Sequence, residues 1–287
     1  MKVFRKIGIA VAVSPGIDAL LAEAHRYASA PGGDVELIHV GARTPEKEQA
    51  IRDSWARTGS AVEPTIVWRT GSPADEILGV IRSDELDLII AGANERESLL
   101  RGFFGSVARA LARDADASVL LITAPQKPPR AIRRIAVNLD FDDDALVLLR
   151  RSLRLAARLA SSEIDIVHVS TKFAEDIAYA DGVDARQLET IEESDVEGTL
   201  ALMRDYVDAA GISLVPVRPQ MITGNRGQAL VDFARRQNVD LMIVPAMQRG
   251  LMLERIFLSD LERLLQNIPC HLLLARPPED MLEEASS

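Results

Sequence analysis

The chain has 287 residues, of which 47% are hydrophobic and 26% charged, and its formal net charge is −10. This length suits about two domains, and each half is long enough to bury a core of its own. The excess of acidic residues, without a dense cluster of lysine and arginine, argues against a nucleic-acid partner. No apolar run approaches the roughly 20 residues of a membrane span. The only cysteine, Cys270, excludes an intramolecular disulfide and begins an apolar strand, which favours a buried, inert thiol and a cytoplasmic protein.

The predicted elements of the first half alternate between strands and helices. We expect strands at 6–13, 34–40, 62–68, 86–92 and 118–122, and helices near 17–30, 45–58, 73–83 and 106–114. The strands are short continuous apolar runs, which is typical of a parallel sheet covered on both faces. The alternating order therefore predicts a doubly wound α/β domain with right-handed crossovers.

The second half repeats this order after a proline-rich spacer. We expect its strands at 133–140, 163–169, 212–217, 239–245 and 271–275, and its helices near 143–160, 195–210, 226–237 and 257–266. The predicted division is a first domain at 1–124, a linker at 125–132, a second domain at 133–277 and a flexible tail at 278–287. An extra acidic segment, 171–198, is expected to form a solvated helix or lid at the edge of the sheet, with a partner-binding surface as the alternative.

The two halves are similar in sequence as well as in predicted order. DVELIHV at 34–40 matches EIDIVHV at 163–169, and DLIIAG at 87–92 matches DLMIVP at 240–245. Asp87 and Asp240 are 153 residues apart, whereas His39 and His168 are 129 apart, so about two dozen residues are inserted between Ser170 and Leu214. A repeat of this length indicates a duplicated domain, and each half can be compared with the other.

One constellation in the first half suggests a ligand site. Gly92 ends a predicted strand, and Gly105-Ser106 begins a predicted helix, whose free N–H groups and dipole favour an anion. Glycine lets the backbone approach a phosphate closely, and the Ser106 hydroxyl can cap the helix and donate to an oxygen. Ala12–Pro15 would line the same crevice if the first and fourth strands are neighbours. A glycine-assisted loop with an N-cap serine is the structural alternative.

Several segments resemble the universal stress protein family, present twice, over residues 3–127 and 133–277. They are KIGIAVAVS at the start, ELIHV, the G-x-P-x-x-E-I helix start at 71–77, DLIIAG, and GSV before the fourth helix. The resemblance implies two tandem Rossmann-like domains of the adenine nucleotide alpha hydrolase-like fold. Each would be a five-stranded parallel sheet of order 3-2-1-4-5 with helices on both faces. It also implies a pseudo-dimer in which the fifth strands, Val119–Ile122 and Leu272–Ala275, pair antiparallel, and it allows a homodimer of whole chains.

The resemblance implies which first-half residues would hold a nucleotide. Gly92, Gly105 and Ser106 match the first glycine, the third glycine and the hydroxyl residue of the family loop, and Val107 completes the GSV motif. Val40 matches the point where the family's main chain meets the adenine. Glu95 replaces the second glycine, and Ala12 replaces the aspartate that follows the first strand. These differences predict weak binding of AMP or ATP, with no required cofactor and no metal.

The second half differs from the family in other positions. It keeps the strand-one aspartate as Asp140, but the four loop positions hold Pro245, Gln248, Leu258 and Ser259. We therefore expect no conventional ATP site there. The run Asp142–Asp144 leads into a helix, where acidic residues complement the dipole, so a structural role is expected rather than a metal site.

No hydrolytic constellation appears in the sequence. His39 and His168 lie in apolar strands, where we expect them in the core or beside the main chain. The predicted crevice offers Ser14, Ser106 and Glu95 without a positioned base, so the protein is not expected to be an enzyme. The expected function is a stress-response module that binds an adenine nucleotide weakly. The alternatives are a non-nucleotide interaction protein that takes an apolar ligand and, third, a slow ATPase.

Overall fold

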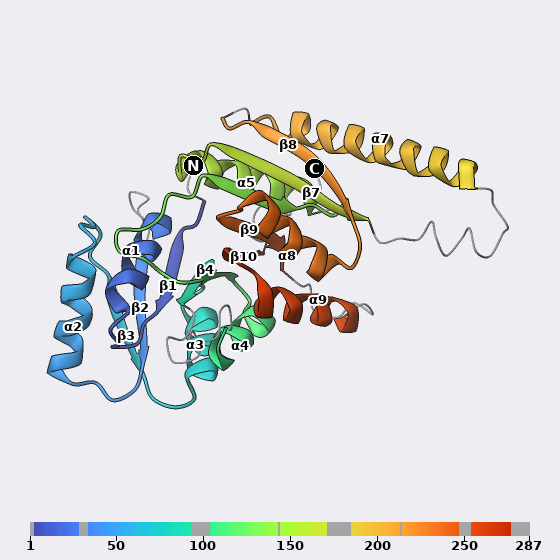
Figure 1. Cartoon of the computed structure of the whole chain (residues 1–287). Coiled ribbons are helices and arrows are strands. Elements are labelled where there is room, and N and C mark those ends of the chain that lie inside the picture. The colour runs from blue at the N-terminus through green and yellow to red at the C-terminus, as the bar shows by residue number, and fades with distance from the viewer. Residues whose placement is uncertain are drawn as a thin grey trace.

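The computed structural model describes residues 3–28, 34–92, 104–142, 144–170, 185–212, 214–246 and 254–276 (Figure 1). Within them the chain forms one ten-stranded sheet with helices on both faces. No helix in this described part is long and apolar enough to cross a membrane.

The first half follows the predicted order closely. Its elements are β1 Lys6–Ala10, α1 Ile17–Ala28, β2 Asp34–Val40, α2 Pro45–Ala56, β3 Thr65–Arg69, α3 Pro73–Ser83, β4 Leu88–Gly92, α4 Ser106–Asp114 and β5 Ser118–Ile122. Helices α2 and α3 each begin with proline in the first turn, where its fixed backbone angle suits the helix and its missing N–H has no partner to lose. Thr44 also caps α2 by accepting from the Lys47 N–H at 3.3 Å.

The second half repeats the first, with one additional long helix. Its elements are β6 Arg134–Asn138, α5 Ala145–Arg158, β7 Glu163–Ser170, α7 Ala185–Ala210, β8 Val217–Thr223, α8 Arg226–Gln237, β9 Leu241–Pro245, α9 Glu254–Asn267 and β10 His271–Ala275. Helix α7 contacts β8 and α5 and extends along the far end of the sheet (Figure 1). The acidic segment expected to be helical at this edge is helical from Ala185 onward, and 171–184 lie outside the described residues.

The strand order confirms the predicted topology of both halves. The sheet runs β3-β2-β1-β4-β5-β10-β9-β6-β7-β8, which is the order 3-2-1-4-5 followed by its mirror sequence. All pairs within a half are parallel, and β5 pairs with β10 antiparallel, with Leu120 opposite Leu273. This central pairing, which we call the seam, confirms the expected pseudo-dimer. It satisfies two apolar strand edges that would otherwise be open to aggregation.

Each face of the sheet carries one hydrophobic cluster that crosses the seam. One cluster packs beneath α1, α2, α5 and α7, and the other beneath α3, α4, α8 and α9. Both therefore contain side chains from both halves. The two halves share their cores as well as a pair of strands, so neither face separates into two independent units.

Equivalent residues repeat their contacts in the two halves. Asp87 accepts from the main-chain N–H groups of Arg5 and Lys6 at 2.6 and 3.1 Å. Its counterpart Asp240 accepts from those of Arg133 and Arg134 at 2.9 and 3.0 Å. Each aspartate thus fixes the start of the first strand of its half, which is a structural reason for its repetition.

One predicted strand was placed wrongly. We expected a strand at 212–217, whereas β8 is Val217–Thr223. Strand β8 is the outer edge of the sheet and is only half-buried, so its sequence VRPQMIT mixes polar and apolar residues. Pro219 is tolerated because an edge strand has one side without a ladder partner. The more apolar stretch before it belongs to the connection from α7.

We predict that Leu273→Ala lowers the free energy of unfolding by about 2–5 kcal/mol, because it opens a cavity in the buried seam. Urea unfolding followed by circular dichroism measures the change. Leu214→Ala, at a leucine that is 70% exposed, is the matched control and should change it by less than about 0.5 kcal/mol. Equal effects of the two substitutions would contradict a shared core at the seam.

Candidate ligand-binding site

A crevice lies at the carboxyl ends of β1 and β4, where the chain leaves these neighbouring strands towards opposite faces of the sheet. Helix α1 follows β1 on one face, and α4 follows β4 on the other. The cavity has a volume of about 510 Å³ and is lined by residues 10–17 and by the ends of β2 and β4 and the starts of α3 and α4. Ligand sites of open α/β sheets lie at such switch points.

All five residues predicted for the site line this crevice: Val40, Gly92, Gly105, Ser106 and Val107. Gly92 packs closely against α1, because a Cβ there would lie 3.1 Å from the Leu20 Cδ1 and this side chain would have to shift slightly. The structure thus brings the predicted residues together from three separate strand ends and helix starts. Glu95, predicted to weaken the site, lies outside the described residues.

The start of α4 forms one end of the crevice. Gly105 is the N-cap residue and brings no side chain to the first-turn N–H groups, and Ser106 is exposed in the first helical position. These N–H groups and the helix dipole are suited to an anion. The guanidinium of Arg109, one turn further on, bonds the Phe104 carbonyl at 3.0 Å and pairs with Glu262 of the second half. Arg109 therefore forms an ion pair that joins the two halves.

His39 is the histidine nearest to this crevice, and it serves the main chain. Its Nδ1 lies 3.0 Å from the carbonyl oxygen of Val11, so Nδ1 carries the hydrogen and donates. The ring also meets Trp68 edge to face at 4.9 Å between centroids. His168 repeats the bond, with Nδ1 at 3.0 Å from the Leu139 carbonyl. The prediction of main-chain-adjacent histidines is confirmed in both halves.

The lining of the crevice is notable for its lack of charge. The described lining contains no Asp, Glu, Lys or Arg, and Ser14, His39 and Ser106 provide its polar side chains. Ala12 occupies the position where a carboxylate could have held a cation. Among the described residues there is also no group of three or more His, Cys, Asp or Glu side chains that could hold a metal ion. The crevice is therefore suited to a ligand with much apolar surface and little charge.

The corresponding place in the second half is occupied by side chains. Asp140, at the position of Ala12, receives two hydrogen bonds from Arg226 at 2.7 and 2.9 Å. Arg226 begins α8, as Pro73 begins α3. Phe141 stacks on His168 at 4.7 Å between centroids and also meets Tyr206 of α7. An ion pair and stacked rings therefore lie where the first half has its cavity wall.

The other second-half positions are described only in part. Pro245 ends β9, while Gln248 and the side chain of Leu258 lie outside the described residues. Asp142 is an exposed residue close to Asp140 and Asp144, and partial burial of its carboxyl together with these like charges raises its pKa. Asp143 is not among the described residues.

Comparison with protein families decides the relationship. The model of the universal stress protein family matches this chain twice, at residues 4–123 and 131–276. The chain belongs to the universal stress protein family. It carries two copies of the domain in tandem, and comparison with curated proteins gave no match.

Solved structures similar to this universal stress protein support the fold over its whole length. A functionally unknown protein from Pseudomonas aeruginosa PAO1 has a TM-score of 0.70 at 15% identity, covering 98% of this chain and 95% of that one. A universal stress protein from Archaeoglobus fulgidus DSM 4304 has a TM-score of 0.63 at 16% identity, covering 97% and 98%. At these identities the likeness concerns the fold.

We predict that Asp140 and Arg226 are coupled by about 0.5–1.5 kcal/mol in a double-mutant cycle of Asp140→Ala and Arg226→Ala. The two-point hydrogen bonding favours the pair, but its partial exposure to water weakens it. Urea unfolding of the four proteins measures the coupling. A coupling near zero would show that the ion pair does not hold the second half closed.

Proposed function

We propose that this universal stress protein is a non-catalytic stress-response module whose first half binds an adenine nucleotide weakly, with AMP preferred over ATP. The observation that carries the proposal is that five predicted binding residues surround one crevice without a charged side chain in its described lining. One end of that crevice is the uncapped start of α4. The remainder is mainly apolar and suits a base.

The number of phosphates follows from the charges. The start of α4 can favour one phosphate group through its N–H groups and dipole. A triphosphate would bring further negative charge and a metal ion into a crevice where the described lining offers neither a cation nor a carboxylate. Burying charge without a partner is costly, so each added phosphate is expected to give little or no affinity.

The apolar lining also supports a second candidate, an interaction protein that takes an apolar ligand instead of a nucleotide. Ile38, Leu20 and Ile77 line the crevice, and Val13 at its edge is 42% exposed. Adenosine and AMP separate the two candidates. A nucleotide site should gain affinity from the single phosphate of AMP, whereas an apolar site should bind adenosine at least as well.

The absence of catalysis is proposed on geometric grounds. Acid–base or nucleophilic catalysis needs a base close to a nucleophile and a third group to orient it. His39 uses Nδ1 for the Val11 carbonyl, and within the described residues no hydrogen bond joins it to Ser14 or Ser106. Any output of the module would then be a contact with a partner, which a bound nucleotide could bias.

We predict by calorimetry that AMP binds with a micromolar or weaker Kd and that ATP binds no more tightly. Ser106→Leu should weaken AMP binding at least tenfold, about 1.4 kcal/mol. The leucine side chain would block the end of the crevice at the start of α4, where the phosphate is expected. Ser259→Leu, at the equivalent position of the second half, is the matched control and should leave binding unchanged.

A second variant places the residues of the second half at the equivalent positions of the first-half crevice. Ala12→Asp with Pro73→Arg installs the pair that Asp140 and Arg226 form in the second half, and it should abolish AMP binding without loss of folding. Submicromolar ATP binding that is lost in Ser259→Leu would contradict the proposal, because it would place the nucleotide in the second half.

We predict that the purified protein hydrolyses ATP no faster than its Ser106→Leu variant. A phosphate-release assay under multiple-turnover conditions measures the two rates. A turnover that is reproduced between preparations and disappears in Ser106→Leu would show that the crevice is catalytic.

A further inference from the structure

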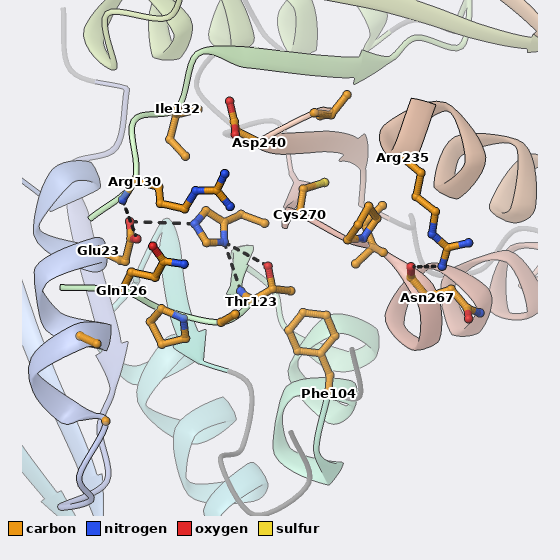
Figure 2. Close-up of a pocket in the computed structure, with 18 of the residues that line it drawn as sticks. Glu23, Phe104, Thr123, Gln126, Arg130, Ile132, Arg235, Asp240, Asn267 and Cys270 are labelled. Carbon is orange, nitrogen blue, oxygen red and sulfur yellow. Dashed lines mark hydrogen bonds and ion pairs between the residues drawn. The ribbon is translucent and has the colours of Figure 1, made fainter. Parts of the chain in front are cut away.

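A second and larger cavity lies between the two halves, next to the seam (Figure 2). Its volume is about 840 Å³, and it is lined by α1, the segment that leaves β5, the end of α9 and the start of β10. Gly16, directly before α1, and Pro125 line both this cavity and the nucleotide crevice, so the two cavities are neighbours. Sequence analysis predicted no site here.

Two buried groups face each other across this cavity. The Glu23 carboxyl on α1 is almost completely buried, and it accepts from the Arg130 N–H at 3.3 Å and the Arg26 Nη1 at 3.4 Å, with the Gln126 main chain also acting on it. The His271 Nδ1 accepts from the Thr123 N–H at 3.1 Å, so the ring hydrogen is on Nε2. That Nε2 lies 4.0 Å from the Glu23 Oε2, too far for a hydrogen bond. The His271 ring therefore contacts Thr123 on one side and faces Glu23 on the other, and both of these partners are labelled in Figure 2.

The ring is neutral at physiological pH. Burial, together with the nearby charges of Arg26 and Arg130, lowers the pKa of His271 to about 4, and the charge of Asp240 opposes this shift. The contact with Glu23 is thus not an ion pair at neutral pH. A buried donor and a buried acceptor are left close together without a direct bond between them.

The equivalent place on the other side of the seam is filled. The repeat relates Glu23 to Arg151, His271 to Ser118 and Thr123 to Arg276. The Arg276 N–H donates to the Ser118 Oγ at 3.1 Å, which reproduces the bond between Thr123 and His271. The long Arg151 side chain then reaches the Arg276 carbonyl at 2.6 Å and lies over the Phe4 ring at 4.3 Å.

The two sides therefore share a main-chain bond but differ in what occupies the space beside it. Where one half has the Arg151 guanidinium, the other has a short carboxyl group that leaves the space to the cavity. A single oxygen that both donates and accepts, about 2.8 Å from each partner, would satisfy the Nε2 hydrogen and the Glu23 carboxyl together. A hydroxyl group has that property, whereas an ionised phosphate oxygen can only accept and an ammonium ion can only donate.

The rest of the lining is suited to a neutral ligand with several hydroxyls. Its two guanidinium groups, from Arg130 and Arg235, balance its two carboxyl groups, from Glu23 and Asp240. Neutral hydrogen-bonding side chains and an apolar wall complete it: Thr123, Gln126, Gln266, Asn267, Phe104 and Ile132. We propose that this cavity is a second ligand site, which takes a neutral polyhydroxylated small molecule, a sugar or polyol, with one hydroxyl bridging His271 and Glu23.

The test uses the full chain and two variants that borrow the other half's residues. Glu23→Arg should fill the cavity as Arg151 does, and His271→Ser should keep the main-chain bond as Ser118 does while removing the Nε2 donor. D-ribose, D-glucose and myo-inositol are titrated by calorimetry, with inorganic phosphate as the comparison. In parallel, ¹⁵N NMR follows the Nε2 resonance of His271. At least one of the three compounds should bind and shift that resonance, and both variants should lose at least tenfold in affinity.

Ser106→Leu separates this site from the nucleotide crevice, because it should weaken AMP binding and leave sugar or polyol binding intact. The proposal is overturned if none of the three compounds binds at millimolar concentration, or if phosphate binds more tightly than all of them. It is also overturned if binding leaves the Nε2 resonance unchanged or persists in both variants. Should Glu23→Arg fail to fold, His271→Ser and the wild-type ¹⁵N shift still decide.

Discussion

The antiparallel pairing of β5 with β10 is the constraint on which the rest of the molecule depends. It joins two parallel sheets into one and lets both hydrophobic clusters run across the join. The pairing also sets the positions of the loops and helices that flank β5 and β10. The cavity beside His271 exists because the seam holds α1 of one half close to β10 of the other. A covalently linked pair of domains can diverge at these places without losing its frame, since the pairing is intramolecular.

The duplication separates what the fold requires from what a ligand would require. Contacts that occur in both halves hold the frame, as with Asp87 and Asp240 or the main-chain bonds of His39 and His168. Some contacts that occur in only one half lie at the cavities. Asp140 and Arg226 pair at the second half's equivalent of the first crevice, where the first half has no charged pair. The seam shows the same divergence on its two sides, with Arg151 filling one side and a cavity on the other. This divergence is what the proposed function requires, with a ligand crevice in the first half and a charged pair at the equivalent place in the second.

The sequence predicted the topology well because the signals for it are local or repeated. Apolar runs marked nine of the ten strands near their true positions, and Gly92 with Gly105-Ser106 indicated the first crevice. The strand β8 was missed because an edge strand lacks a continuous apolar run, although the 153-residue offset from β3 would have found it. The ion pair between Asp140 and Arg226 left a trace in the repeat, since both positions differ from Ala12 and Pro73. The cavity beside the seam left no recognisable signal in the sequence, because Glu23, Thr123 and His271 come together only through tertiary packing.

The central claim is that the two halves share one frame and that only the first retains an open nucleotide crevice. Methyl NMR of the valine-labelled full chain, titrated with AMP, tests it most directly because Val40 and Val169 are equivalent positions at the ends of β2 and β7. The account predicts that the methyl signals of Val40 and Val107 shift with AMP concentration and that those of Val169 do not. Shifts at Val169 matching those at Val40, or none at either position at saturating AMP, would contradict it.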